Sequence, residues 1–144
     1  MNHSDYLDIW VTLVHTNDAI SRLRQRELKP YHISAEQTGV LSILRSAHDS
    51  LTPAEISRRL IRDPSSVTVI LNRMVAKGLI KKAKDKIRKN LVRVTMTDKG
   101  VRLYNQILNK MCIYELFSAL PDEHCAQLKT HLNTLLDKAT RELK

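Results

Sequence analysis

The side chains that could recognise another molecule gather between residues 63 and 93. On a helical wheel of residues 64–77, Val67, Ile70, Leu71 and Met74 fall on one side. The opposite side holds short, hydrogen-bonding side chains and no acid, so it could enter a DNA major groove without steric or electrostatic conflict. The residues on or beside this predicted outer face are Ser65, Ser66, Thr68, Val69, Asn72, Arg73, Ala76 and Lys77.

Four of these side chains can contact the edges of DNA bases in specific ways. Asn72 can pair bidentately with adenine, Thr68 and Val69 can touch a thymine methyl group, and Arg73 can reach guanine or phosphate. The alternative is an ordinary amphipathic surface helix, whose outer face normally carries Glu and Lys. An outward Val69 fits that alternative less well, because it implies that something covers this position.

Two groups of residues are predicted to contact the DNA backbone. In the first turn, Ser65 and Ser66 place hydroxyls and free backbone N–H groups where a phosphate would lie. The segment from Lys77 to Arg93 adds eight Lys and Arg residues against a single acid, Asp85. Such a run is more often a solvated face, but directly after a recognition-type helix it predicts a wing. In this wing Lys82, Lys84 and Lys86 would meet phosphates, and the tip, Arg88 with Lys89, would enter the minor groove. Asn90, the next residue, is a further predicted DNA contact.

Capping signals predict the elements that would position these residues. Ser34 with Gln37 and Thr52 with Glu55 are capping-box patterns, and Asp63 precedes a proline, so helices should begin at all three places. We expect helices over 6–29, from 34, over 53–60 and over 64–77, short strands over 79–80 and 91–96, and a loop over 82–90. A long helix over 97–120 and a last helix from 121 should follow.

These elements predict a mainly α protein with a small β-hairpin, in which long dimerisation helices flank a winged helix-turn-helix lobe. The expected divisions are an N-terminal dimerisation helix over 1–32, the DNA-binding lobe over 33–98 and C-terminal dimerisation helices over 99–144. The terminal helices carry apolar stripes without partners of comparable length, which favours a homodimer. A monomeric bundle is the alternative.

Composition agrees with a polyanion-binding protein. The 144 residues match one domain, and their net charge of +9 with a sequence pI near 9.8 attracts nucleic acid or an anionic membrane. No secretory signal or membrane-spanning stretch is visible, so a cytoplasmic location is expected.

Cys112 and Cys125 form no disulfide framework; they are interpreted as buried thiols, with a redox switch as the alternative.

Three segments together resemble the MarR family of bacterial winged helix-turn-helix transcription regulators: LTPAEISRRL (51–60), DPSSVTVILNRMVAKGLI (63–80) and VRVTMTDKG (92–100). The resemblance covers the whole chain, because the long flanking helices match that family's dimerisation region. It implies a homodimer that binds a pseudo-palindromic operator and usually represses transcription until a small effector releases it. Double-stranded DNA, a second copy of the chain and a small-molecule effector are therefore the expected partners, and no cofactor is expected.

The wing departs from the family pattern. The family typically has Asp-x-x-Asp-Arg-Arg, in which the second Asp is expected to hold the tip arginine. Here the matching positions run from Asp85 to Asn90, and Arg88 replaces that second Asp. We therefore expect this wing to bind more by bulk charge than by one clamped side chain.

Other functions have weaker support. Three isolated glycines build no phosphate-binding loop, and no nucleophile elbow is present, so an enzyme is not expected. A metal site would have to use His124, Cys125 and His131, but the two histidines are not spaced by the four residues that would bring two ligands together on a helix.

His15 could line an effector pocket or be an ordinary surface residue. The basic hairpin lacks aromatic residues for RNA stacking and is no amphipathic helix for a membrane surface, so the remaining alternative is a general nucleic-acid-binding protein without effector control.

Overall fold

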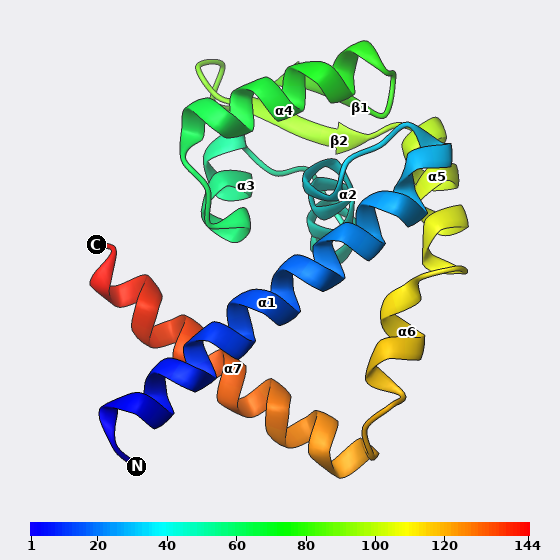
Figure 1. Ribbon diagram of the computed structural model, residues 1–144. Coiled ribbons are helices and arrows are strands. Elements are labelled where there is room, and N and C mark those ends of the chain that lie inside the picture. Colours follow the sequence, from blue (N-terminus) through cyan, green and yellow to red (C-terminus); the bar gives the residue numbers. More distant parts are fainter. The chain divides into compact units, whose positions relative to one another are not determined.

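A computed structural model describes residues 1–144, which divide into the units Met1–Lys110 and Met111–Lys144 (Figure 1). The fold is mainly helical with one two-stranded antiparallel hairpin, as predicted. The first unit contains α1 (His3–Leu28), the 3-10 helix η1 (Lys29–Tyr31), α2 (Ala35–Ala47), α3 (Pro53–Leu60), α4 (Pro64–Ala76), β1 (Ile80–Lys84), β2 (Val92–Met96) and α5 (Asp98–Leu108). The second unit contains α6 (Cys112–Phe117) and α7 (Asp122–Glu142).

The three predicted helix starts are confirmed. Ser34 and Thr52 each form a full capping box with the residue three positions later, and the Asp63 carboxylate accepts a hydrogen bond from Ser66 N. These side chains satisfy backbone N–H groups that a helix leaves without partners. Gly78 follows α4 with φ of 72°, the left-handed conformation that ends a helix most easily at glycine.

One apolar core holds the first unit together. The buried side of α4 packs against α2, α3 and β1, and α5 adds Tyr104 and Ile107 to the same core. Burying each large aliphatic side chain contributes about 1.5 to 3 kcal/mol, so this core fixes which side of α4 faces outward. The side chains buried to the greatest extent are Leu28, Val40, Leu41, Ile56, Val67, Leu71, Met74, Ile80, Val94 and Ile107.

The hairpin is longer than the sequence predicted. β1 pairs with β2 from Ile80↔Met96 to Lys84↔Val92, so Lys82 and Lys84 lie in a strand and not in the predicted 82–90 loop. The loop is shorter because Asp85 N donates to Leu91 O at 2.9 Å, which closes it one residue after Lys84. Reciprocal backbone hydrogen bonds between Leu51 and Val94, of 3.1 and 2.8 Å, join β2 to the segment before α3.

The predicted long helix over 97–120 is wrong, because the chain forms α5 and then α6. Asn109 ends α5 and Met111 has extended backbone angles, so the helix is interrupted for three residues. Asparagine is a weak helix former, since its side chain competes for backbone hydrogen bonds. Capping at Thr97 and the start of the last helix after Pro121 agree with prediction.

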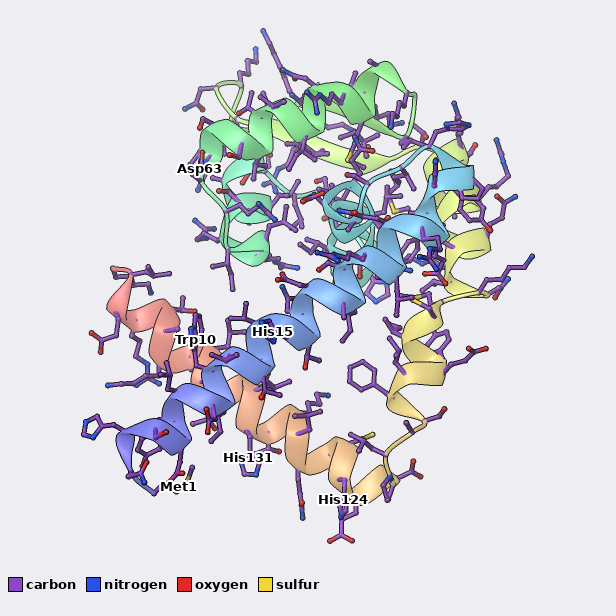
Figure 2. All side chains as sticks on the ribbon, in the orientation of Figure 1. Met1, Trp10, His15, Asp63, His124 and His131 are labelled. Carbon is purple, nitrogen blue, oxygen red and sulfur yellow. The ribbon has the colours of Figure 1, made fainter.

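Both units leave large apolar side chains exposed. On α1 these include Tyr6, Ile9, Trp10 and Leu13, and Figure 2 marks Trp10 on that helix. On α7 they are Leu132, Leu135 and Leu136. Neither helix, nor any other in the protein, has the length and hydropathy of a membrane span.

Candidate nucleic-acid interface

The outer face of α4 is exposed as predicted. Val69 leaves 49% of its surface in solvent, although the helix has a complete apolar side elsewhere. Thr68 Oγ1 donates to Pro64 O at 2.9 Å, so its hydroxyl proton is already used. The exposed residues of this face are Ser65, Thr68, Val69, Asn72, Arg73 and Ala76, and the buried side consists of Val67, Leu71 and Met74, with Ile70 partly buried.

A hydrogen bond links α4 to the hairpin. Lys82 Nζ donates to Asn72 Oδ1 at 2.7 Å, whereas the sequence predicted Lys82 as a phosphate contact. An ammonium group has only donors, so the amide oxygen of Asn72 must face Lys82 and the amide nitrogen is left for another partner. The oxygen keeps a second lone pair, so Asn72 retains the donor and the acceptor that pairing with adenine requires.

The N-terminus of α4 differs from the prediction for Ser65 and Ser66. Both hydroxyls donate to the Asp63 carboxylate, the Ser66 hydroxyl at 2.6 Å, and Ser66 N donates to it at 2.9 Å. Hydrogen bonds from Ser65 and then Ser66 hold the pKa of Asp63 well below its usual range. Figure 2 shows Asp63 where α4 begins. The first turn therefore already holds an anion, and both serine hydroxyls and the Ser66 N–H are occupied by it.

Lys77 also differs from its predicted place beside the outer face. Its ammonium donates to His32 O at 2.5 Å and to Gln37 Oε1 at 3.0 Å, and Gln37 is buried. Lys77 therefore ties the end of α4 to η1 and α2. This role was missed because the two partners are 45 and 40 residues away in the sequence.

Asp85 organises the wing, a role that could not be predicted from its residue type alone. Its Oδ1 accepts hydrogen bonds from Ile87 N and Arg88 N, both at 2.8 Å, and its Oδ2 accepts from Arg93 Nε at 2.8 Å. The Arg88 N–H and then the Arg93 guanidinium are the main reasons that the pKa of Asp85 lies well below its usual range. An Asp that binds backbone two and three residues later is an Asx turn, which the loop sequence could have suggested.

Arg93 joins the wing to the helical part of the lobe. Besides its bond to Asp85, its guanidinium lies 3.9 Å from the Glu55 carboxylate on α3. The hydrogen bond to Asp85 is the main reason that the pKa of Arg93 is raised. The hydrogen bond that the Glu55 carboxylate accepts from the Thr52 N–H is the main reason that the pKa of Glu55 is lowered. The hairpin is thus held on the lobe by a chain of charges from Asp85 through Arg93 to Glu55.

The remaining wing residues point into solvent. Lys84, Lys86, Arg88, Lys89 and Asn90 are exposed, on the strand end and the loop that form the free end of the hairpin (Figure 1). Asp85 is the only acid in this stretch, and it is bound to Arg93 and the backbone. The free end therefore presents cations without a competing free carboxylate.

A cavity of about 420 Å³ lies on the same unit, at the end of α4. Leu79 and Leu103 give it apolar walls, and Lys77, Lys99 and Arg102 give it a positive rim. Lys99 Nζ donates to the backbone oxygen of Lys77 at 2.8 Å, and the Lys77 ammonium donates to His32 O and Gln37 Oε1, so both cations are held in place. The cavity volume falls within the range of small-molecule pockets, although the cavity is shallow and open to solvent.

The other candidate residues form no comparable arrangement. His124 and His131 lie on α7 (Figure 2), and no group of three or more His, Cys, Asp or Glu side chains has the geometry to hold a metal ion. Cys125 Sγ contacts Phe117 O at 3.3 Å, and both cysteines are half-buried. His15 is exposed on α1, away from the cavity lining.

A capped pair of helices, an exposed second helix and a basic hairpin braced against them define a winged helix-turn-helix protein. The model of the MarR family matches residues 33–86. The multiple antibiotic resistance protein MarR of Escherichia coli (strain K12) is 30% identical over 128 residues, which cover 86% of this chain and 88% of that protein. The chain belongs to the MarR family of transcriptional regulators.

Two solved structures show the same architecture. A mutant MarR from E. coli complexed with operator DNA superimposes with a TM-score of 0.80 at 27% identity, covering 94% of this chain and 99% of that one. The organohalide-sensing regulator RdhR-CbdbA1625, in its 2,4-dichlorophenol-bound form, gives a TM-score of 0.82 at 28% identity, covering 96% and 82%. The likeness extends over both units and is not confined to the lobe.

Proposed function

We propose that this protein is a sequence-specific transcriptional regulator that binds a pseudo-palindromic operator as a homodimer and represses transcription until a small effector releases it. The observation that supports this most strongly is the acid-free outer face of α4 beside a cationic hairpin. The relative from E. coli was solved with operator DNA, which supports the same use of the lobe. The proposed activity is DNA binding, which needs no catalytic step and no cofactor. We expect the protein to act in the cytoplasm, where the DNA is.

The proposed contacts follow from the geometry. Thr68, through its methyl group, and Val69 contact thymine methyl groups, Asn72 pairs with adenine, and Arg73 reaches guanine or phosphate. Phosphate contacts come from Lys84 and Lys86 of the wing, and its tip, with Arg88, Lys89 and the adjoining Asn90, enters the adjacent minor groove. Ser65, Ser66, Lys77 and Lys82 support these contacts from within the protein, because their polar groups already bind Asp63, His32, Gln37 and Asn72.

A salt-dependent gel shift with duplex DNA from the protein's own promoter region tests the proposal. Asn72→Ala should reduce the preference for this duplex over a scrambled one by about 10-fold or more, because a bidentate base contact is worth about 1–3 kcal/mol of discrimination. Asn105→Ala, which removes an exposed asparagine from α5, is the matched control and should change nothing. If the wild-type protein binds both duplexes equally at every salt concentration, it is a general nucleic-acid-binding protein instead.

The exposed apolar residues of α1 and α7 support a homodimer, with dimerisation assigned to 1–32 and 99–144 and DNA binding to 33–98. Light scattering should give a mass near twice the 16.6 kDa of one chain. Trp10→Glu, at a residue 59% exposed in the single chain, should yield monomers because it places a charge in the buried interface. Asn17→Glu, at a polar exposed position on the same helix, should remain dimeric. A wild-type monomer contradicts the proposal.

The cavity at the end of α4 is the proposed effector site. Apolar walls with a positive rim suit a small ligand that has an apolar body and an anionic or strongly polar group. RdhR-CbdbA1625, a relative of similar fold, was solved with 2,4-dichlorophenol. A ligand that competes for Lys77 would loosen the hydrogen bonds that tie α4 to η1 and α2. The operator assay repeated with small phenols and aromatic carboxylates should therefore show release of the DNA.

A further inference from the structure

Ile87 is the most exposed large apolar residue of the chain. It leaves 92% of its surface in solvent, at the free end of the hairpin. Its neighbours Lys86, Arg88 and Lys89 are all exposed cations. An isolated exposed apolar side chain needs no explanation, but this one lies in the centre of the most cationic segment.

The loop holds Ile87 outward. Asp85 Oδ1 accepts hydrogen bonds from both Ile87 N and Arg88 N, and Asp85 Oδ2 anchors the loop to Arg93. Two more backbone hydrogen bonds close the loop, from Leu91 N to Arg88 O at 2.8 Å and from Asp85 N to Leu91 O at 2.9 Å. With its own N–H bonded to Asp85, the Ile87 backbone cannot turn toward the lobe without breaking this hydrogen bond. Its exposure is therefore a property of the native loop.

The charges around Ile87 indicate what covers it. Lys86, Arg88 and Lys89 have no acidic partner, because Asp85 already binds Arg93 and the backbone. A matching surface must be anionic on both sides and apolar between them. The DNA minor groove has this pattern, since phosphates line its edges and sugar C–H groups form its walls. Proteins that bind this groove frequently insert apolar side chains into it.

We propose that Ile87 enters the minor groove beside the site read by α4, and that it is the wing's apolar contact with the sugar walls. Lys86, Arg88 and Lys89 then bind the phosphates on either side. This places an apolar side chain, in addition to the cations, at the centre of the wing contact. The inference rests on the proposed function, because it assumes that the protein binds duplex DNA.

Operator affinity measured across a salt series tests this assignment. Ile87→Ala should weaken binding about 10-fold per wing, because it removes three carbons that are about half buried in the complex. The slope of log affinity against log salt should not change, since no counterions are involved. Lys86→Ala is the matched control, and it should reduce the slope by about 0.9 per contact. Ile87→Leu, which keeps the apolar volume, should bind like the wild type.

A second readout locates the contact in the groove. Inosine in place of guanine along the flanks of the operator removes the amino group from the minor groove and leaves the major-groove pattern unchanged. The wild type should gain affinity for the inosine duplex, and Ile87→Ala should gain less. Equal gains for both proteins, or unchanged affinity of Ile87→Ala, would overturn the assignment.

Two other outcomes separate this inference from the function on which it rests. If the wild type binds no duplex specifically, the proposed function itself fails. If Ile87→Ala binds DNA normally but loses binding to phosphatidylserine vesicles that the wild type shows, the tip contacts a membrane surface and the groove assignment is wrong. Because Ile87 is exposed, its substitution should leave the melting temperature unchanged, which excludes misfolding as the cause of weak binding.

Discussion

Replacing Gly100 with alanine is expected to lower the melting temperature by about 10 °C, corresponding to about 3 kcal/mol of unfolding free energy. A Cβ atom at Gly100 would lie 2.1 Å from Leu79 O and 3.1 Å from the Leu79 carbonyl carbon. Both are backbone atoms, so no side-chain rotation can relieve the clash. The backbone is also fixed there, because Thr97 N donates to Leu79 O at 3.1 Å and Thr97 Oγ1 donates to Gly78 O at 2.6 Å.

Gly39→Ala is the matched control for this prediction. A Cβ at Gly39 would lie 3.2 Å from Leu60 Cδ2, the mobile end of a side chain. Alanine inside a helix also gains about 0.5–1 kcal/mol over glycine, which offsets the slight crowding. Thermal unfolding followed by circular dichroism should therefore show a large loss for Gly100→Ala and little change for Gly39→Ala. Equal melting temperatures for all three proteins would mean that α5 does not approach the Leu79 turn this closely.

Neutralising the wing is expected to have the largest effect on DNA binding. Alanine at Lys84, Lys86, Arg88 and Lys89 together should reduce operator affinity by about three orders of magnitude per wing near physiological salt. It should reduce the salt slope by about 0.9 for each phosphate contact that is lost. These side chains are exposed and lack acidic partners, so the fold should persist. Fluorescence anisotropy with a labelled operator at several salt concentrations gives both quantities.

The control removes the same charge from another part of the chain. Lys110, Lys138, Arg141 and Lys144 are exposed and lie outside the wing, and their joint replacement by alanine lowers the net charge equally. This variant should lose little affinity, because none of these four residues is a proposed DNA contact, and charges farther from the DNA than about 8–10 Å are screened at such salt concentrations. If both quadruple variants weaken binding to the same extent, overall charge drives association and the wing has no special role.

Local signals explain which parts of the fold could be predicted. Ser34, Thr52 and Asp63 marked helix starts because a capping residue and its target lie only three positions apart. The outward position of Val69 followed from helical periodicity alone. By contrast, the break after Asn109 was missed, because the apolar pattern continues through it.

The candidate site was predicted less completely, because several of its side chains act on distant or unexpected partners. Lys77 and Lys82 were assigned to DNA by charge, yet one binds η1 and α2 and the other orients Asn72. The family pattern shows only that an Asp stands at position 85. Its hydrogen bonds to the Ile87 and Arg88 backbone and to Arg93 depend on the conformation of the loop, which the pattern does not give. Residue type alone could indicate that the wing is basic, but it could not identify which charges remain available.

The carboxylate of Asp63 has a consequence for the angle at which a duplex can approach. Most helix N-termini attract phosphate through their dipole, but here a resident carboxylate already neutralises that end of α4. A phosphate arriving end-on would meet like-charge repulsion, and both serine hydroxyls and the Ser66 N–H would already be bound to the carboxylate. If the protein binds DNA as proposed, we therefore expect the duplex to approach α4 from its flank, with the middle turns that carry Thr68, Val69 and Asn72 deepest in the groove.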